Sequence, residues 1–377
     1  MIDFAQVKTW RQELHQIPEV GLQEHLTSAY LKDQLEKMGY ETIPVLDTGI
    51  LVYIDNNARK TIAFRSDIDA LAIEEDQSHK CRSKIAGMMH ACGHDGHMSA
   101  LLGLAALLKK NQKKPDYNVL LVFQPAEESP GGARLIVEQD ILEQYNVKAI
   151  FGMHLMPSLD QGVVGCRPGP LMAQAGELDV TIEGKSAHAG LPHLGIDTIN
   201  IAANLLGLYQ QILPRQLPPF EPCVLNIGKI EGGTVRNIVA SKTKMEGTLR
   251  AFNPDVFAQV KKAIFDLNAG FEKTYNCKIT TTLPDGYPPV INDKNLYRRF
   301  IKLTGNDYLE LEEPMMLAED FAFYQTRVPG IFFFMGTRSE VHQSNLHTAT
   351  FDFDEAVLLK AIDLYANILF NINLEEL

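Results

Sequence analysis

The stretch VLLVFQPAEES, residues 119–129, joins an apolar, β-rich run to a pair of adjacent glutamates. Its first five residues are all apolar, which is typical of a strand buried on both faces of a parallel sheet. In open α/β sheets, ligands bind beyond the carboxyl ends of the strands. Glu127 and Glu128 follow this run closely, so the sequence predicts that both carboxylates lie at a ligand-binding edge.

Two more runs of this kind end in side chains that can bind a cation. TIAFRS (61–66) is followed by Asp67 and Asp69, and AIFGMHL (149–155) carries His154. Helical patterns separate these runs, and an alternation of strands and helices indicates an α/β domain with a mixed, largely parallel sheet. The remaining elements expected there are strands GILVYI (49–54) and GIFFFMG (330–336) and helices over 99–111 and 133–144.

A different pattern occupies residues 174–286. GELDVTIEGKSAH alternates apolar and polar residues as a half-exposed strand does, and the segments after it read helix, strand, strand, helix, strand. That order, β-α-β-β-α-β, is the ferredoxin-like arrangement. We therefore predict a small α+β domain over 174–286, inserted into an α/β domain formed by 1–173 and 287–377.

Length and composition agree with this division and exclude several classes of protein. The 377 residues exceed the ~250–300 at which one core stops growing. Thirty-five basic against 47 acidic residues give a net charge of −12, which argues against nucleic-acid partners and anionic membranes. The longest apolar run, LLGLAALL (101–108), is too short to span a bilayer, and the amino-terminal residues lack a signal-like apolar region. Five cysteines favour a reducing compartment over a disulfide framework, so we expect a cytoplasmic enzyme.

The densest chemical motif is HACGHDGH, residues 90–97. It holds three of the eleven histidines, together with Cys92 and Asp95, around Gly93. Thiolate and imidazole are ligands for Zn²⁺ and related divalent metals. The local spacing does not decide which side chains converge, and a polar loop with a free cysteine is the alternative. For Glu127 and Glu128 the alternatives are a divided role, one binding metal and one moving protons, or an exposed acidic turn.

Four other residues are ordinary when each is considered alone. His188 in GKSAHAGLPH, Asn237 in TVRNI and Arg250 in EGTLR are all compatible with a surface position. His347 in SNLHTATFDFD is as compatible with a surface position as with a ligand role.

Taken together, ten blocks in order resemble the dinuclear-metal peptidase family that contains the aminoacylases and glutamate carboxypeptidase. Within it they are most similar to the amidohydrolase branch, which holds hippurate hydrolase and the hydrolases of auxin–amino-acid conjugates. HACGHD (90–95) and QPAEE (124–128) are the most specific blocks. The others include RQELHQIPEVGLQEHLT (11–27), FRSDIDALAI (64–73), GMHLMP (152–157), GKSAHAGLPHLGID (184–197), GGTVRNIV (232–239), EGTLRAF (246–252), AEDFAFY (318–324) and LHTATFDFD (346–354).

The resemblance implies a site for two divalent metal ions, with Zn, Mn, Co and Ni not distinguished. Its ligands would be Cys92, His94, Glu128, His154 and His347. Glu127 would be the general base for a metal-bound water, and Asp67 the acid that positions this base or a ligand. The inserted domain would serve as a lid and as the dimerisation domain. From it, His188 would stabilise the oxyanion, either within one chain or across a homodimer. Asn237 and Arg250 would bind the substrate carboxylate.

The implied reaction is hydrolysis of the amide bond of N-acyl amino acids to a carboxylate and a free amino acid. The motifs GKSAH (184–188) and LAEDFAFY (317–324) favour a general aminoacylase over N-acetyldiaminopimelate deacetylase of lysine biosynthesis. That deacetylase and a dipeptidase or carboxypeptidase of the same family remain alternatives. Outside the family, a cysteine hydrolase with Cys92 as nucleophile and a non-catalytic metal-binding protein are the competing hypotheses.

Overall fold

A computed structural model describes residues 2–374 of the chain, which fold into two compact units. The first unit runs up to Leu171 and resumes over Ile291–Glu313 and from Asp320 onward. The second unit comprises Met172–Val290 and Pro314–Glu319. Within residues 2–374, no helix combines the length and the apolar character needed to cross a membrane.

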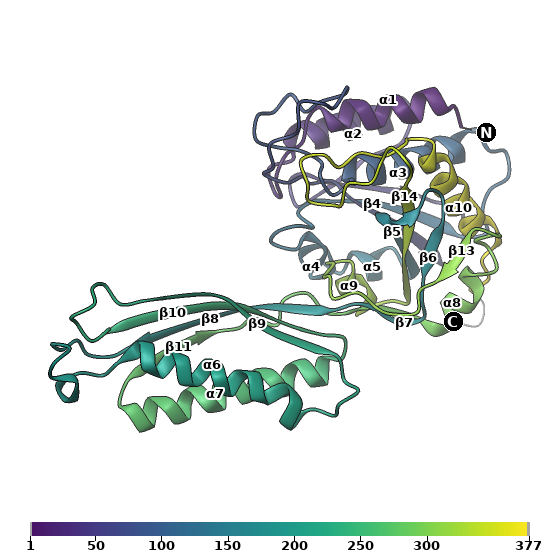
Figure 1. Cartoon of the computed structure of the whole chain (residues 1–377). Coiled ribbons are helices and arrows are strands. Elements are labelled where there is room, and N and C mark those ends of the chain that lie inside the picture. Colours follow the sequence, from purple (N-terminus) through teal and green to yellow (C-terminus); the bar gives the residue numbers. More distant parts are fainter. Residues whose placement is uncertain (1, 375–377) are drawn as a thin grey trace. The chain divides into compact units, whose positions relative to one another are not determined.

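The first unit is built on an eight-stranded sheet of order β1-β2-β4-β3-β5-β14-β6-β13 (Figure 1). Neighbouring strands β4, β3, β5 and β14 run parallel, whereas β1 and β2 pair antiparallel at one edge. The predicted mixed, largely parallel sheet is therefore confirmed. The strands are β1 (Ile43–Val45), β2 (Gly49–Ile54), β3 (Thr61–Asp67), β4 (Asn118–Gln124), β5 (Val147–Asp160), β6 (Val164–Cys166), β13 (Tyr308–Glu310) and β14 (Gly330–Arg338). Short strands β7 (Gly169–Met172) and β12 (Val290–Asn292) form a separate pair.

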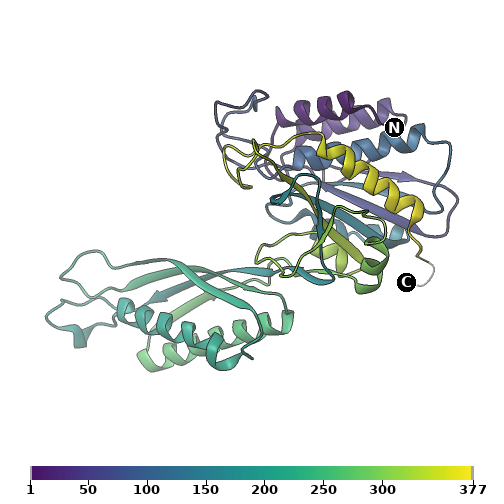
Figure 2. The same cartoon turned by 45° about the vertical axis from the view of Figure 1, so that its right-hand side comes forward.

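Helices cover both faces of this sheet (Figures 1 and 2). One face carries α1 (Phe4–His15), α2 (His25–Lys37), α3 (His94–Lys110) and α10 (Val357–Asn371), and the other carries α4 (Gly132–Val137), α5 (Ile141–Gln144) and α9 (Ala322–Gln325). Helix α8 (Lys294–Phe300) packs against β14. Phe64 of β3 and Phe333 of β14, the strands on either side of β5, both pack onto Tyr365 of α10. The helix predicted over 133–144 is two helices. Helix α4 ends at Val137, and α5 begins after Asp140, whose left-handed backbone conformation (φ 54°) does not continue a helix.

The second unit is a four-stranded antiparallel sheet of order β11-β8-β10-β9 with two helices packed against it. The chain order is β8 (Gln174–Glu183), α6 (Thr198–Gln216), β9 (Cys223–Gly232), β10 (Lys242–Ala251), α7 (Pro254–Tyr275) and β11 (Lys278–Thr282). This confirms the predicted ferredoxin-like order. Asp197 caps α6 by accepting from the N–H groups of Ile199 and Asn200, and Asn253 caps α7 just before Pro254.

The strand register brings the predicted chemical residues to one edge of the larger sheet. Asp67 of β3 pairs with Gln124 of β4, and Arg65 pairs with Gly152 of β5. The residues after β3 and β4 therefore emerge beside His154, near the carboxyl ends of three parallel strands. Helix α3 begins directly at His94 and adds the HACGHDGH segment to the same place.

Candidate metal centre

Six residues of the first unit gather at this edge of the sheet. Their ligand atoms form overlapping triads within which all atoms lie within 4.8 Å of one another. The triads are Cys92–His94–His154, Cys92–Glu128–His347 and His94–Glu127–Glu128. The structure thus brings together all five residues predicted as ligands. Glu127, the predicted general base, is the sixth residue of the group. Cys92 and His94 come from the segment at the start of α3, His154 from β5, the glutamates from the loop after β4, and His347 from the loop before α10.

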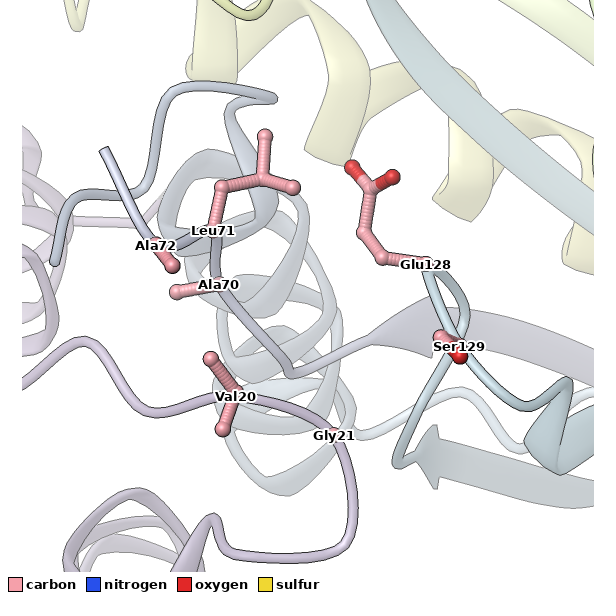
Figure 3. A pocket seen from close by; sticks show the side chains of 7 residues that line it. All are labelled: Val20, Gly21, Ala70, Leu71, Ala72, Glu128 and Ser129. Atoms are coloured by element: carbon pink, nitrogen blue, oxygen red, sulfur yellow. The ribbon is translucent and has the colours of Figure 1, made fainter. Parts of the chain in front are cut away.

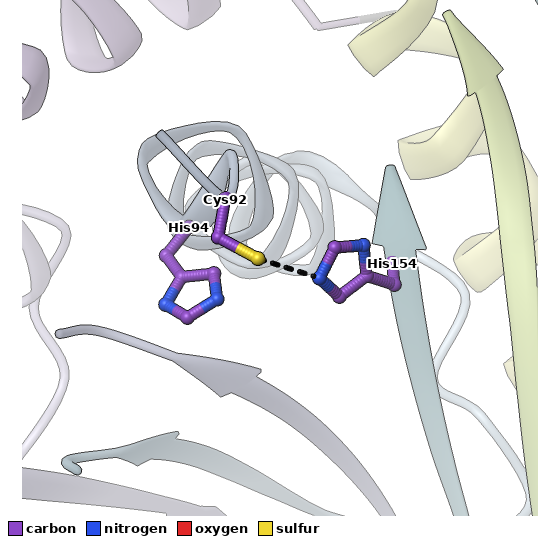
Figure 4. A group of neighbouring side chains, drawn as sticks. All are labelled: Cys92, His94 and His154. Carbon is purple, nitrogen blue, oxygen red and sulfur yellow. Dashed lines mark hydrogen bonds between the residues drawn. The ribbon is translucent and has the colours of Figure 1, made fainter. Parts of the chain in front are cut away.

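Cys92 lies at the centre of this group. Its Sγ is 3.3 Å from Nε2 of His154, the contact drawn in Figure 4, and 3.3 Å from Nε2 of His347. Burial raises the pKa of the Cys92 thiol well above its usual value, and the nearby carboxylates of Glu128 and Glu127 raise it further. Without a cation, the thiol therefore stays protonated, whereas a bound metal ion would favour the thiolate.

Gly93 makes the turn that places Cys92 and His94 side by side. Its backbone is left-handed (φ 83°), a conformation that residues with a Cβ rarely adopt. A Cβ on Gly93 would also lie only 3.1 Å from Cδ1 of Leu155. Both the backbone conformation and the packing therefore favour glycine between the two side chains.

The rings of His94 and His154 are oriented by backbone carbonyls. Nδ1 of His94 lies 2.9 Å from the Asp69 carbonyl oxygen, and Nδ1 of His154 lies 2.6 Å from that of Leu155. Because a carbonyl only accepts, each Nδ1 carries a proton and donates it. Nε2 of His94 is buried without a hydrogen-bond partner. This is the arrangement of a metal-binding histidine, whose outer nitrogen is fixed by a second partner.

The negative charge around His94 favours a cation at this place. Burial lowers the pKa of His94, but the charges and hydrogen bonds of Asp67, Asp69 and Glu128 outweigh burial and raise it to about 10. The same carboxylates that hold a proton on His94 would attract a divalent ion. A buried, unpartnered ring nitrogen beside thiol and carboxylate donors therefore fits a transition-metal site.

His347 is the exposed member of the group, with 52% of its side chain accessible. Its Nε2 lies 3.1 Å from Oε1 of Glu128. Burial raises the pKa of Glu128, yet the hydrogen bond from His347 and the charge of His94 lower it below the ordinary value. His347 has a left-handed backbone (φ 58°), and its N–H donates to the Ala91 carbonyl. Unfavourable backbone conformations of this kind concentrate at functional sites.

Asp67 lies behind His94, one of the predicted ligands. Its Oδ1 accepts from Nδ1 of His97 at 2.7 Å, its Oδ2 accepts from Arg65 at 2.7 Å, and Nε2 of His94 is 3.7 Å away. Nε2 of His97 in turn accepts from the N–H of Leu155 at 3.0 Å. Both nitrogens of His97 are thus engaged by the protein. Although burial raises the pKa of Asp67, the charges of His94 and His97 hold it well below its usual range.

Asp69, which the sequence places at this edge as a side chain able to bind a cation, contacts the site through both its carboxylate and its carbonyl oxygen. Its Oδ2 accepts from the backbone N–H of Glu128 at 3.0 Å, and its carbonyl oxygen accepts from His94. It therefore touches two of the proposed ligands. The only signal in the sequence is its place two residues beyond the end of β3.

Asp95 of the HACGHDGH segment is directed toward α1. Its Oδ2 lies 2.7 Å from Nδ1 of His15 and 3.0 Å from Nε of Arg11. His15 also contacts Glu75 through Nε2 at 3.0 Å. Asp95 therefore anchors the start of α3 to α1.

His188, Asn237 and Arg250 belong to the second unit. The loops that carry His188 and Asn237 adjoin, because the N–H of Ala189 donates to the Asn237 carbonyl at 3.0 Å. Arg250 lies toward the other end of β10. Lys242 pairs with Glu183, near His188, whereas Arg250 pairs with Ala175. Eight residues at the rise of a strand amount to about 26 Å, so the structure brings His188 and Asn237 together but not with Arg250.

Comparison with known proteins assigns the chain to a family. Residues 63–371 match the model of peptidase family M20/M25/M40. The chain belongs to this family. It is 37% identical to IAA-amino acid hydrolase ILR1-like 4 of Arabidopsis thaliana, over 95% of this chain and 83% of the relative. It is 36% identical to N-acetyldiaminopimelate deacetylase of Lactobacillus helveticus, over 96% of each.

A solved structure of an M20 protein also resembles this chain over nearly its whole length. The YXEP protein of Bacillus subtilis, described as a dinuclear metal binding peptidase from M20 family, superposes with a TM-score of 0.83 at 31% identity. The alignment covers 97% of each chain. The predicted dinuclear-metal peptidase family and the class of metallo-amidohydrolase are thus confirmed, whereas the roles of individual residues remain predictions.

Proposed function

We propose that this M20 protein hydrolyses the amide bond of N-acyl amino acids at a dinuclear metal site. The observation that carries the proposal is the convergence of five ligand-type side chains, with the buried Glu127 beside two of them, His94 and Glu128. Thiolate, imidazole and carboxylate ligands together suit divalent transition metals. The ligands would be Cys92, His94, Glu128, His154 and His347.

A bound pair of such ions would supply Lewis acidity toward the scissile carbonyl and lower the pKa of a bound water molecule. Glu127 would take the proton from the attacking water and pass it to the leaving amine. Glu127 is 6% exposed and shares a triad with His94 and Glu128. Asp67 and Asp69 would hold His94 and Glu128 in place while the proton moves.

The second unit would supply the contacts to the rest of the substrate. Arg250, with its planar guanidinium, suits bidentate binding of the amino-acid carboxylate, and Asn237 adds an amide donor. His188 is an exposed side chain that could donate a hydrogen bond to the developing oxyanion. Because His188 and Arg250 lie near opposite ends of β10, one substrate would meet both only if they came from different chains. We therefore favour a homodimer in which His188 acts on the active site of the second copy.

A cysteine hydrolase would need Cys92 as a thiolate. Activated cysteines have a lowered pKa and partial exposure. Cys92 is 6% exposed, and burial raises its pKa. These observations favour the metal-ligand role. Cleavage of N-acetyldiaminopimelate or of a dipeptide remains the alternative within the family.

The decisive experiment compares wild type with Glu127→Gln after reconstitution with Zn²⁺, Mn²⁺, Co²⁺ or Ni²⁺. N-acetyl and N-benzoyl amino acids, N-acetyldiaminopimelate and dipeptides serve as substrates. Loss of a general base costs about 10²–10⁴-fold in rate, so we expect that loss in kcat with an unchanged metal content. Undiminished turnover by Glu127→Gln would refute the base assignment, and the absence of hydrolysis of every N-acyl amino acid would refute the function.

Mixed dimers test the role of His188. His188→Ala and Glu127→Gln chains are each expected to be inactive when alone. If His188 acts across the dimer, each mixed dimer regains one intact site, or up to about half of the activity of a wild-type dimer, since that site keeps both residues. No recovery in dimers shown to be mixed would place His188 and Glu127 of the same chain in one site.

A further inference from the structure

Two histidines and a glutamate converge in a second cluster of the first unit, outside the group around Cys92. Their ligand atoms all lie within 4.8 Å of one another. Oε1 of Glu75 is 3.0 Å from Nε2 of His15 and 2.7 Å from Nδ1 of His79. His15 ends helix α1, whereas Glu75 and His79 belong to the loop between β3 and α3. One carboxylate oxygen thus faces two imidazole nitrogens from separate parts of the chain.

The spacing of these three atoms fits one metal ion. Zn²⁺ binds imidazole nitrogen and carboxylate oxygen at about 2.0–2.2 Å, so the ligand atoms around a tetrahedral ion lie about 3.3 Å apart. The two measured distances, 3.0 and 2.7 Å, need to lengthen only slightly to admit the ion. Two imidazoles with one carboxylate suit Zn²⁺ and similar transition metals, whereas Mg²⁺ and Ca²⁺ prefer oxygen ligands alone.

Two of the three ligand groups are oriented by a partner on their far side. Nδ1 of His15 lies 2.7 Å from Oδ2 of Asp95, which fixes the ring and directs Nε2 toward Glu75. Oε2 of Glu75 accepts from the backbone N–H of Ser83 at 2.5 Å, which leaves Oε1 to the histidines. A carboxylate behind the outer nitrogen is a usual partner of a metal-binding histidine. An ion pair between His15 and Glu75 alone would not need His79 at the same oxygen.

The cluster is buried on the α1 side and reached by solvent on the loop side. The side chains of His15 and Glu75 are 1% and 2% exposed, and that of His79 is 11% exposed. A buried carboxylate beside two imidazoles is favourable only while protons or a cation lie between them. Zinc sites with three protein ligands keep a fourth position for water, which would enter from the His79 side.

We propose that His15, Glu75 and His79 form an auxiliary site for Zn²⁺ or a similar divalent transition metal. This auxiliary site is separate from the proposed metal centre around Cys92, and it does not depend on the proposed function. A bound ion joins the end of α1 to the loop between β3 and α3. It replaces the protons that lie between these side chains in the metal-free protein.

The loop that the ion would fasten begins and ends beside the proposed metal centre. Residues 72–88, all of which the structure describes, form neither helix nor strand. At one end, Leu71 and Ala72 line a cavity of about 370 Å³ together with Glu128 (Figure 3). At the other end, Met89 exchanges backbone hydrogen bonds of 3.1 and 3.0 Å with Leu71, just before the HACGHDGH segment. An ion at the auxiliary site therefore restrains a segment that borders the metal centre at both ends.

Titration of the metal-free, full-length chain with Zn²⁺ measures the number of sites. We expect wild type to bind one ion more per chain than His79→Ala, because this variant lacks one of the three ligands. Glu75→Gln preserves the shape of the side chain and should lose the same ion. His25→Ala, at an exposed position of α2, is the matched control and should bind as many ions as wild type.

Limited proteolysis locates the additional ion. Trypsin cleaves after basic residues, and three of them are exposed in this loop: Lys80, Arg82 and Lys84. An ion at about ten times its Kd lowers the population of locally opened forms about tenfold, so Zn²⁺ should slow cleavage there by that factor in wild type. The protection should persist in Cys92→Ser, whose auxiliary site is intact, and vanish in His79→Ala. Cleavage after Lys113, outside this loop, is the internal control.

Equal numbers of bound ions in wild type and His79→Ala would overturn the auxiliary site. Protection of the loop that is lost in Cys92→Ser but kept in His79→Ala would also overturn it, because the protecting ion would then lie in the centre around Cys92. Cleavage of the wild-type loop at the same rate with and without Zn²⁺ would do the same. Neither measurement involves hydrolysis of a substrate, so both results are independent of the proposed function.

Discussion

Asp69 and Glu128 are joined by a hydrogen bond of 3.0 Å from the backbone N–H of Glu128 to the carboxylate of Asp69. The bond connects the loop after β3 to the loop after β4. Asp69 also receives the Nδ1 proton of His94 on its carbonyl oxygen. One residue therefore holds the backbone of Glu128 and the imidazole of His94, which come from different elements.

Replacing Asp69 by alanine should weaken metal binding. Partners that orient metal ligands typically contribute 10–100-fold to metal affinity or activity, and we expect a loss in that range for Asp69→Ala. Titration with Zn²⁺ and a competing chelator measures the affinity. Asp160→Ala, at an exposed carboxylate of the same unit, is the control. An unchanged metal affinity in Asp69→Ala would contradict the positioning role.

Removing divalent metal should abolish hydrolysis and lower the melting temperature. A ligand present at about 100 times its Kd stabilises the folded state by about 2.7 kcal/mol. Dialysis against a chelator, followed by thermal unfolding and activity assays with and without added metal, measures both effects. In Cys92→Ser, added metal should raise the melting temperature less than it does in wild type. Cys223→Ala, in the second unit, should behave as wild type. A melting temperature independent of metal in wild type would speak against the site.

His15 should make folding stability depend on pH. Burial and the charge of Arg11 lower its pKa, but hydrogen bonds to Asp95 and Glu75 prevail and leave it raised. Because the pKa of His15 is higher in the folded state, protonated His15 stabilises the fold fully below its unfolded pKa of about 6.5. This stabilisation is lost as the pH rises through the folded pKa. The free energy of unfolding lost in His15→Gln should therefore be larger at about pH 6 than at about pH 9.

Urea unfolding of wild type and His15→Gln at both pH values tests this prediction. His25→Gln, at an exposed position at the start of α2, is the control. A loss of the same size at both pH values would show that His15 contributes by packing alone.

The buried pair Arg65–Asp320 should be much more important for stability than a surface pair. Its Nη2–Oδ1 distance is 2.7 Å, and the side chains are 1% and 0% exposed. Asp320 also accepts from Gln124 and from the N–H of Ala133. Removing one partner of a buried ion pair costs about 3–5 kcal/mol, so Asp320→Ala should lower the free energy of unfolding by that amount.

Asp33→Ala provides the comparison for this pair. Asp33 binds Lys37 on the exposed face of α2 at 2.6 Å, and such surface pairs contribute about 0–1 kcal/mol. Chemical denaturation measures both variants. Similar losses in Asp320→Ala and Asp33→Ala would contradict the role of the buried pair.

Much of the fold is legible in local sequence patterns. The apolar run before Gln124 is a buried parallel strand, and residues 174–283 follow the ferredoxin-like order, because strand and helix periodicity depend on near neighbours. The division of the helix predicted over 133–144 into α4 and α5 was not predictable. The apolar pattern continues through this segment, and the left-handed conformation of Asp140 is not visible in it.

The sequence by itself also determined which residue types reach one edge of the sheet, because parallel strands carry their following residues to the same side. Only the tertiary structure decided which members of HACGHDGH face the cluster. Asp95 is directed toward His15 and His97 toward Asp67, while Cys92 meets His347, 255 positions further along the chain. The physical reason is that convergence depends on how α3, β5 and the loop before α10 pack together, and no local pattern encodes that packing.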